Sequence, residues 1–180
     1  GSIPQGQKWG TPDEFWKNMR EIEKIYLDLS KDLVSKAPNT SKSILFCPES
    51  AIPLPIRYFP EFQKPLQDFA KTHQSYLLSG LFDRQTWQSP SLNGAALIEP
   101  SGKMDHWYYK RQLVPFGEFF PYRQVLGNLP ILGGLISQLN PMKDDVEAGK
   151  TASLMPTPLG KLGTLICFES VYPHVARNSV

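Results

Sequence analysis

A cysteine stands at the end of an apolar run, at the point where the chain must turn. The octapeptide 163–170 begins with apolar and β-branched residues, reaches Cys167 and becomes polar at Glu169 and Ser170. This pattern predicts a buried strand that ends at the cysteine. A thiol there can act as a nucleophile, and the N–H groups beyond the bend can hold an oxyanion. Taken alone, the octapeptide fits an inert core cysteine better, because free cysteine is among the most buried residue types.

Two other reactive residue types also stand at predicted strand ends. Glu49 follows the apolar run 43–47, and Lys110 closes the run 104–110. A partly buried carboxylate can take the proton of a thiol, and a neighbouring lysine can stabilise both thiolate and oxyanion. The three groups would have to converge on one carbon about 3 Å away, which spacing cannot show. The structural alternatives are a helix N-terminal acid for Glu49 and a solvated strand end for Lys110.

The bulk composition is that of one globular domain, 1–180. The 180 residues are 41% hydrophobic and 20% charged, with a net charge of +2 and no cluster of basic residues, so nucleic acid is an unsuitable partner. Cys47, Cys167 and three scattered histidines form no zinc pattern, and we expect no metal and a free Cys167. No run of about 18 apolar residues occurs, so these residues contain no predicted membrane span.

The first half of the chain predicts helices that alternate with strands. Thr11 and Pro12 begin a helix that runs to about Ser35, because apolar residues recur there at helical spacing. These residues are Phe15, Met19, Ile22, Ile25, Tyr26 and Leu29. We further expect a strand at 43–47 buried on both faces, a helix at 61–72, strands at 75–81 and 93–99, and a hairpin through the turn 100–103 to 104–110.

The second half is richer in loops, in keeping with 17 prolines and 13 glycines in the chain. We expect a structured loop at 113–122, a short helix with a mobile apolar loop at 125–139, and a return to the sheet at 146–150. A hairpin over 154–167 turns at 158–160, and 169–178 begins a helix. Together these elements predict an α/β fold (α+β mixed sheet) with helical covering.

Three stretches resemble the catalytic blocks of the carbon–nitrogen hydrolase (nitrilase) superfamily. They are residues 48–53, 108–118 and 166–169. Within this superfamily, the run Lys-x-x-Leu-Val-Pro-Phe-Gly-Glu at 110–118 and the opening residues 3–9 are similar to the apolipoprotein N-acyltransferase branch. The likeness extends over most of the chain.

The resemblance implies a nitrilase-like four-layer α-β-β-α sandwich, incomplete in this chain, which lacks the first strand and the C-terminal part. It implies a place in the bacterial inner membrane through transmembrane regions outside this chain, with the domain facing the periplasm. The implied reaction moves the sn-1 acyl chain of a phospholipid, through a cysteine thioester, to the N-terminal amine of diacylglyceryl-cysteine in an apolipoprotein. No cofactor is implied.

The resemblance also assigns roles to residues. Cys167 corresponds to the nucleophile, Glu49 to the general base and later acid, and Lys110 to the lysine on the oxyanion side. The backbone N–H of Phe168 corresponds to a second oxyanion donor. Some family members carry tyrosine at this position, and Phe168 lacks that hydroxyl.

Further positions have both a functional and a structural interpretation. Glu118 matches a supporting glutamate, although a loop-bracing role is favoured. Glu169 and Trp9 fall on positions that the family uses, but could be a first-turn helix acid and a core aromatic. The loop Leu126–Leu139 could be a lid that enters lipid and admits acyl chains, or a packed surface loop.

Two other functions remain open at this point. A soluble nitrilase-type amidase would use the same Glu49, Lys110 and Cys167 but would transfer the acyl group to water. A binding domain with a vestigial site would have lost one of the three residues, and all three are present.

Overall fold

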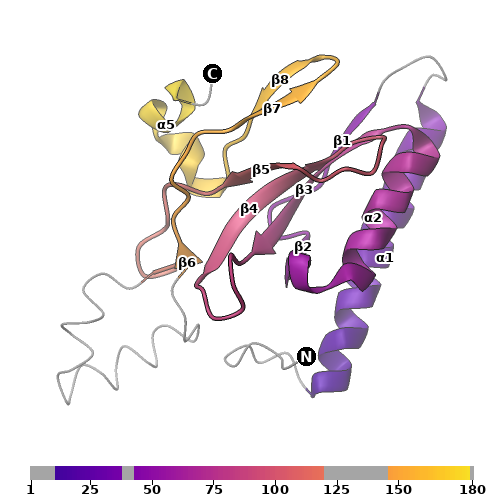
Figure 1. Ribbon diagram of the computed structural model, residues 1–180, viewed down its shortest axis with the longest axis horizontal. Helices are drawn as coiled ribbons and strands as arrows, with labels where there is room; N and C mark the ends of the chain where they lie inside the picture. Colours follow the sequence, from indigo (N-terminus) through magenta and orange to yellow (C-terminus); the bar gives the residue numbers. More distant parts are fainter. Residues whose placement is uncertain (1–10, 38–42, 120–145, 179–180) are drawn as a thin grey trace.

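The computed structural model describes residues 11–37, 43–119 and 146–178 (Figure 1). Its elements are α1 (Pro12–Lys36), β1 (Ile44–Phe46), β2 (Ile52–Pro55), η1 (Ile56–Tyr58), α2 (Pro60–His73), β3 (Tyr76–Asp83), β4 (Ser91–Ile98), β5 (His106–Tyr109), β6 (Val146–Glu147), β7 (Leu154–Thr157), β8 (Gly160–Gly163), η2 (Cys167–Val171) and α5 (Pro173–Arg177). Trp9, the opening residues 3–9 and the expected lid at Leu126–Leu139 lie outside the described residues.

A six-stranded mixed sheet forms the centre of the molecule, as the sequence predicts. β3 pairs in parallel with β1 and β2 and antiparallel with β4, which continues antiparallel to β5 and parallel to β6. The hairpin from β4 to β5 and the return of β6 to the sheet are confirmed. β2 was not predicted, because Pro53 and Pro55 are typical of loops; its place beside a single neighbour, β3, explains how the prolines are tolerated.

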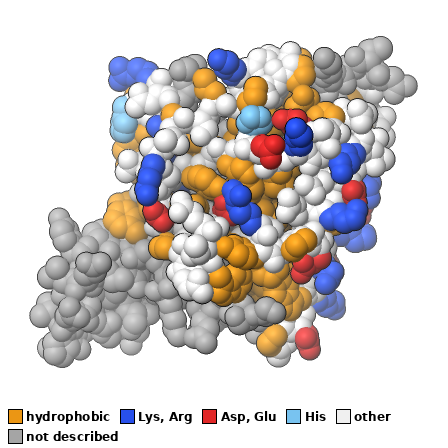
Figure 2. All heavy atoms as spheres, in the orientation of Figure 1, with side chains coloured by type: hydrophobic (Ala, Val, Ile, Leu, Met, Phe, Trp, Pro, Cys, Tyr) orange, Lys and Arg blue, Asp and Glu red, His pale blue; other side chains and the backbone are white. Residues whose placement is uncertain are grey.

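The helices α1 and α2 cover one face of this sheet (Figure 1). Both predicted helices are confirmed, and Thr11 caps α1 through a reciprocal capping box with Glu14. Of the apolar residues that recur at helical spacing, Ile25 and Leu29 do not face the core, because both are more than half exposed. The buried residues of α1 are Phe15, Met19, Glu23 and Ser30, which lie on a different line along the helix. Figure 2 shows many of the charged side chains on the side of the molecule where α1 lies.

The opposite face of the sheet is covered by the β7–β8 hairpin. Thr157 pairs with Gly160 across the predicted turn, and Met155 packs against sheet residues of β3, β4 and β5. The described residues thus form an α–β–β arrangement, with the short helix α5 beyond the hairpin (Figure 1). The complete four-layer sandwich remains an expectation from the resemblance.

Three local predictions are wrong. Residues 164–166 form no strand, because β8 already ends at Gly163; the segment is unpaired, with alternate residues buried. β1 is not buried on both faces, since Leu45 packs under the helices while Phe46 on the other face is 66% exposed beside a cavity. The expected helix at 169–178 is interrupted at Tyr172: η2 begins at Cys167, and Pro173 starts a separate helix.

Within the described part of the chain, no helix is both long and apolar enough to span a bilayer.

Candidate active site

Glu49 lies in the turn between β1 and β2, held against the middle of β3. Both strands pair with β3, β1 at residues 76–78 and β2 at residues 81–82. Gly80 lies beneath the turn, where a Cβ atom would come within 2.3 Å of the carbonyl oxygen of Pro48. Only glycine allows this approach, so the backbone of β3 fixes the position from which the Glu49 side chain projects.

Lys110 directly follows β5, and its side chain is 1% exposed. Its Nζ atom lies 2.8 Å from Oε1 of Glu118 and 3.5 Å from Oε1 of Glu49. Burial, the largest influence, lowers the pKa of Lys110, but the hydrogen bond and charge of Glu118 and the charge of Glu49 outweigh it and hold the pKa above its usual value. The lysine therefore stays charged between two carboxylates.

Glu118 is brought to this cluster by a tight turn. Its N–H donates to the carbonyl oxygen of Val114, and the N–H of Val114 donates to Oε2 of Glu118 at 2.9 Å. Phe116 at the tip of the turn has a φ of 63°, which bulky residues rarely adopt. Glu118 thus braces its own loop, as the structural interpretation held, and its other oxygen also pairs with Lys110.

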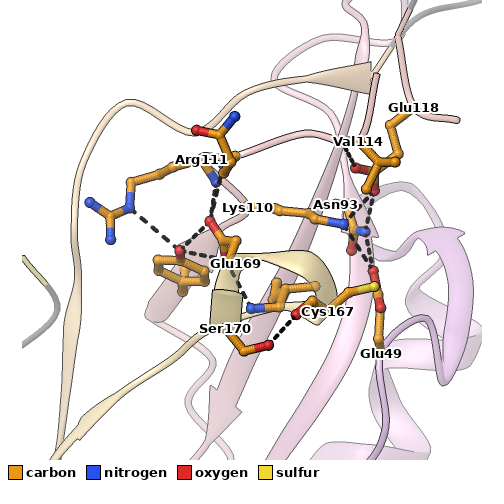
Figure 3. Close-up of polar contacts among 12 residues, drawn as sticks. Glu49, Asn93, Lys110, Arg111, Val114, Glu118, Cys167, Glu169 and Ser170 are labelled. Atoms are coloured by element: carbon orange, nitrogen blue, oxygen red, sulfur yellow. Dashed lines mark hydrogen bonds and ion pairs between the residues drawn. The ribbon is translucent and has the colours of Figure 1, made fainter. Parts of the chain in front are cut away.

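Asn93 completes the cluster, and sequence reasoning missed it. Its Nδ2 atom donates to Oε1 of Glu49 at 2.8 Å and to Oε1 of Glu118 at 3.1 Å (Figure 3). The residue is 3% exposed and belongs to β4, between otherwise apolar neighbours. A polar amide in a buried apolar strand was the signal that could have revealed it, because such groups require partners.

Cys167 is the first residue of η2 and has a φ of 53°. The residue is exposed, and its sulfur points toward the Glu49 carboxylate (Figure 3). Both side chains line a cavity of about 310 Å³ whose other walls include apolar residues. These are Phe46, Leu78, Ala95, Leu162, Leu165 and Ile166. The structure therefore brings Glu49, Lys110 and Cys167 together from three separate strand ends or turns.

Glu169 holds the Cys167 turn to the segment that follows Lys110. Its side chain accepts hydrogen bonds from the Tyr108 hydroxyl and from the N–H groups of Arg111 and Ile166, each at 2.8 Å. The N–H of Gln112 donates to it as well, at 3.1 Å. The residue is completely buried. Glu169 thus makes more contacts than an acid that only occupies the first turn of a helix.

Phe168 is not among the residues that line the cavity, whereas Cys47 is. Phe168 is partly exposed, and its ring packs edge-on against Tyr172. Cys47 lines the same cavity as Cys167; both are free thiols, and burial raises the pKa of the Cys47 thiol. Among the described residues, no group of three His, Cys, Asp or Glu side chains could hold a metal ion.

Comparison with known proteins assigns the family. The family model described as carbon–nitrogen hydrolase matches residues 4–179. The chain belongs to the carbon–nitrogen hydrolase family.

Several relatives with similar sequences are named apolipoprotein N-acyltransferase. The protein from Geobacter metallireducens is 28% identical over 182 residues, covering 100% of this chain and 32% of its own length. The protein from Thermosynechococcus vestitus is 29% identical over 177 residues, covering 98% of this chain and 31% of its own length. The chain thus spans about one third of the length of these relatives.

Solved structures of the family share the fold. A carbon–nitrogen hydrolase from Helicobacter pylori superposes with a TM-score of 0.63 at 16% identity, covering 88% of this chain and 50% of that one. A nitrilase-superfamily protein from Saccharomyces cerevisiae gives a TM-score of 0.62 at 13% identity, covering 97% and 57%. At these identities the likeness concerns the fold alone.

The arrangement in this carbon–nitrogen hydrolase suits acyl chemistry. A thiol faces a carboxylate that can take its proton, and a charged lysine lies beside that carboxylate. The N–H groups in the first turn of a helix have no acceptors within the helix, so the turn after Cys167 can provide a donor for an oxyanion.

Proposed function

We propose that this chain is the catalytic part of an apolipoprotein N-acyltransferase, as a single nitrilase-like domain over residues 1–180. The observation that carries the proposal is the convergence of Cys167 with the Glu49–Lys110–Glu118 cluster at one cavity. The acyltransferase relatives, similar over the full chain, favour acyl transfer over hydrolysis. The substrates are a phospholipid donor and a diacylated apolipoprotein acceptor.

In the first step Glu49 accepts the proton of the Cys167 thiol, and the sulfur attacks the carbonyl carbon of the sn-1 ester. Lys110 and the backbone N–H of Phe168 stabilise the negative oxygen of the tetrahedral intermediate. The bond between carbon and the glycerol oxygen then breaks. Glu49 returns the proton to that oxygen, which releases a lysophospholipid and leaves a thioester on Cys167.

In the second step the α-amine of diacylglyceryl-cysteine attacks the thioester carbon. Glu49 takes a proton from the attacking amine, and the same donors hold the second oxyanion. The carbon–sulfur bond breaks, and the thiolate recovers its proton from Glu49. An amide forms, so the apolipoprotein gains its third acyl chain and the enzyme returns to its starting state.

The cellular setting is part of the same proposal. The donor and acceptor are both membrane lipids, so the domain would work at the bacterial inner membrane, facing the periplasm, held there by transmembrane regions outside this chain. The loop Leu126–Leu139 would contact lipid and admit the acyl chain. We assign no cofactor, because a thiol, a carboxylate and a lysine suffice for every bond made and broken above.

The test uses the full-length membrane protein with a phospholipid labelled in its sn-1 chain. We expect a hydroxylamine-sensitive label on the wild-type protein and none on Cys167→Ala. Glu49→Gln and Lys110→Ala should lower the labelling rate at least about 100-fold, as expected for an essential base or oxyanion stabiliser. A diacylated lipopeptide should then discharge the label onto its amine.

The same experiment separates the amidase alternative. Cys167-dependent hydrolysis of small amides, with no label taken from phospholipid, would reject the acyltransferase and favour the amidase. Transfer of the label to water at the same rate with and without lipopeptide would reject the acceptor.

A further inference from the structure

Asn93 and Lys110 donate to the same two carboxylate oxygens, and each nitrogen lies closer to a different one of the two. Nδ2 of Asn93 lies 2.8 Å from Oε1 of Glu49 and 3.1 Å from Oε1 of Glu118. Nζ of Lys110 lies 3.5 Å from the first of these oxygens and 2.8 Å from the second. The four polar groups therefore form a closed ring in which each Oε1 atom accepts from two nitrogens (Figure 3).

The ring determines how the amide of Asn93 is oriented. If its oxygen faced the carboxylates, three negative or partly negative oxygens would lie together, so the NH₂ group must face them. Oδ1 is buried and has no hydrogen-bond partner within residues 11–37, 43–119 and 146–178. A buried acceptor without a partner destabilises the folded state. The amide of Asn93 thus leaves its own oxygen without a partner, while its nitrogen donates to one oxygen of each carboxylate.

The ring also distinguishes the two oxygens of Glu49. Oε1 carries both donors, whereas Oε2 makes no hydrogen bond with the described residues. The sulfur of Cys167 points toward this carboxylate (Figure 3). One oxygen is therefore fixed and the other is left with its lone pairs for a proton.

We propose that Asn93 is the positioning residue of the general base, which it holds through Oε1 so that Oε2 alone receives the proton of the Cys167 thiol. This inference rests on the proposed role of Glu49. Asn93 contacts neither the thiol nor the substrate in this scheme. It acts by fixing the direction of the carboxylate. Its uncharged amide also donates a hydrogen bond that favours the charged carboxylate, and this amide, unlike a lysine, does not titrate.

The test compares Asn93 variants in the full-length protein by the pH dependence of thioester labelling from phospholipid. Asn93→Ala removes both donors, and we expect a loss of roughly 10- to 100-fold at neutral pH, the fold-change that corresponds to a hydrogen bond to a charged group. We also expect the acid limb of the profile to move to higher pH, because the protonated carboxylate gains on the charged one. Asn93→Gln, which keeps both donors on a longer side chain, should restore part of the rate and move the limb back.

Asn93→Asp provides the sharpest comparison, because it has the same shape but donates only when protonated. Its labelling should be weaker than that of Asn93→Ala at neutral pH and should recover toward acidic pH. The control is Ser79→Ala, a change of another buried polar residue in the neighbouring strand β3, whose side chain hydrogen-bonds to the Cys47 thiol and not to a carboxylate of the ring. We expect Ser79→Ala to leave the acid limb unchanged, whatever it does to the melting temperature.

A second readout keeps the inference separate from the proposed function. The rate at which iodoacetamide alkylates Cys167, followed by mass spectrometry, needs no lipid and should show the same shift of its acid limb in Asn93→Ala. A loss by the same factor at every pH, or no loss at all, would reject the positioning role. Absence of any label on the wild-type protein would reject the acyltransferase proposal, while the alkylation profile would still decide the role of Asn93.

Discussion

Glu169 shows what one buried side chain can do for a site that it does not enter. Its two oxygens accept from the Tyr108 hydroxyl and from the backbone N–H groups of Arg111, Gln112 and Ile166. The segment after Lys110 and the turn that begins at Cys167 are therefore tied to one carboxylate. A neutral amide has one acceptor oxygen where these donors require two.

We accordingly expect Glu169→Gln to lower the free energy of unfolding by about 2–3 kcal/mol, because at least one buried donor loses its charged acceptor. Thioester labelling should fall more than tenfold. Thermal melts of the full-length protein measure the first effect, with Glu147→Gln as the control. That change also replaces a carboxylate with an amide, but in a weak surface ion pair with Lys150, so its effect should stay below about 1 kcal/mol. Equal melting temperatures for the two variants would contradict the bridging role.

At this scale the sequence allows Glu49, Lys110 and Cys167 to be proposed, because each stands where an apolar run stops. It does not reveal Asn93, whose partners lie 44 and 25 positions away along the chain. Nor does it reveal that Glu169 is buried, since an acid two residues after a strand end is more often a solvated helix start. Both depend on contacts between segments that lie far apart along the chain.

Among the elements, α1 carries an acid on the face that packs into the molecule. Glu23 is buried, and its Oε1 atom has no partner in the part of the chain that the structure describes. Burial raises the pKa of Glu23 to about 7, with Arg20 opposing the shift and Glu61 adding to it. The folded state thus holds a proton that the unfolded chain gives up between its ordinary pKa and about pH 7.

Since the folded state binds more protons in this window, stability falls as pH rises through it, and the loss is complete above about pH 7. We expect Glu23→Gln, which resembles the protonated acid, to stabilise the protein on the order of 2–3 kcal/mol at pH 8 and to have little effect at pH 5. Melting temperatures at the two pH values measure this. Glu21→Gln, on the exposed side of the same helix, should be neutral at both; a pH-independent effect of Glu23→Gln would rule out the titration.

The elements themselves were predictable where periodicity was strong. α1, α2, β3 and β4 follow directly from apolar spacing, and the β7–β8 turn follows from Pro158 and Gly160. Strand β2 was not predicted, because its prolines are typical of loops. Its pairing with β3 depends on a neighbour in space. The segment 164–166 resembles a strand in sequence, and Thr164 and Ile166 are buried while Leu165 is exposed, but the segment has no strand partner among the described residues.

At the scale of the whole molecule, the two cysteines differ in access although they share one cavity. Cys167 is exposed, whereas Cys47 is half-buried and burial raises the pKa of its thiol. We expect iodoacetamide at pH 7.5, without reductant, to alkylate Cys167 at least tenfold faster than Cys47, because the thiolate is the reacting form. Peptide mass spectrometry of the full-length protein reads both sites. An unreactive Cys167 would indicate a disulfide or a closed site and would oppose the nucleophile role.

The overall architecture depended on the resemblance more than on element prediction. Helix and strand positions give a mixed sheet with helical covering, but not which face the hairpin covers. The motif at 110–118 indicated the family, and the expected four-layer sandwich follows from that resemblance. The chain spans about one third of the length of its acyltransferase relatives, and the layers described here are those of the described residues.

The left-handed backbone conformation at Cys167 opposes efforts to raise the thermal stability of this domain. A non-glycine residue at a φ of 53° costs of order 1–3 kcal/mol, a cost that glycine does not share. A screen that selects only for yield or heat resistance will therefore favour Cys167→Gly, which relieves the backbone strain but also removes the thiol. Laboratory evolution toward thermostability therefore has to select for the proposed acyl transfer in every round, because Cys167→Gly would stabilise the fold while it removes the thiol.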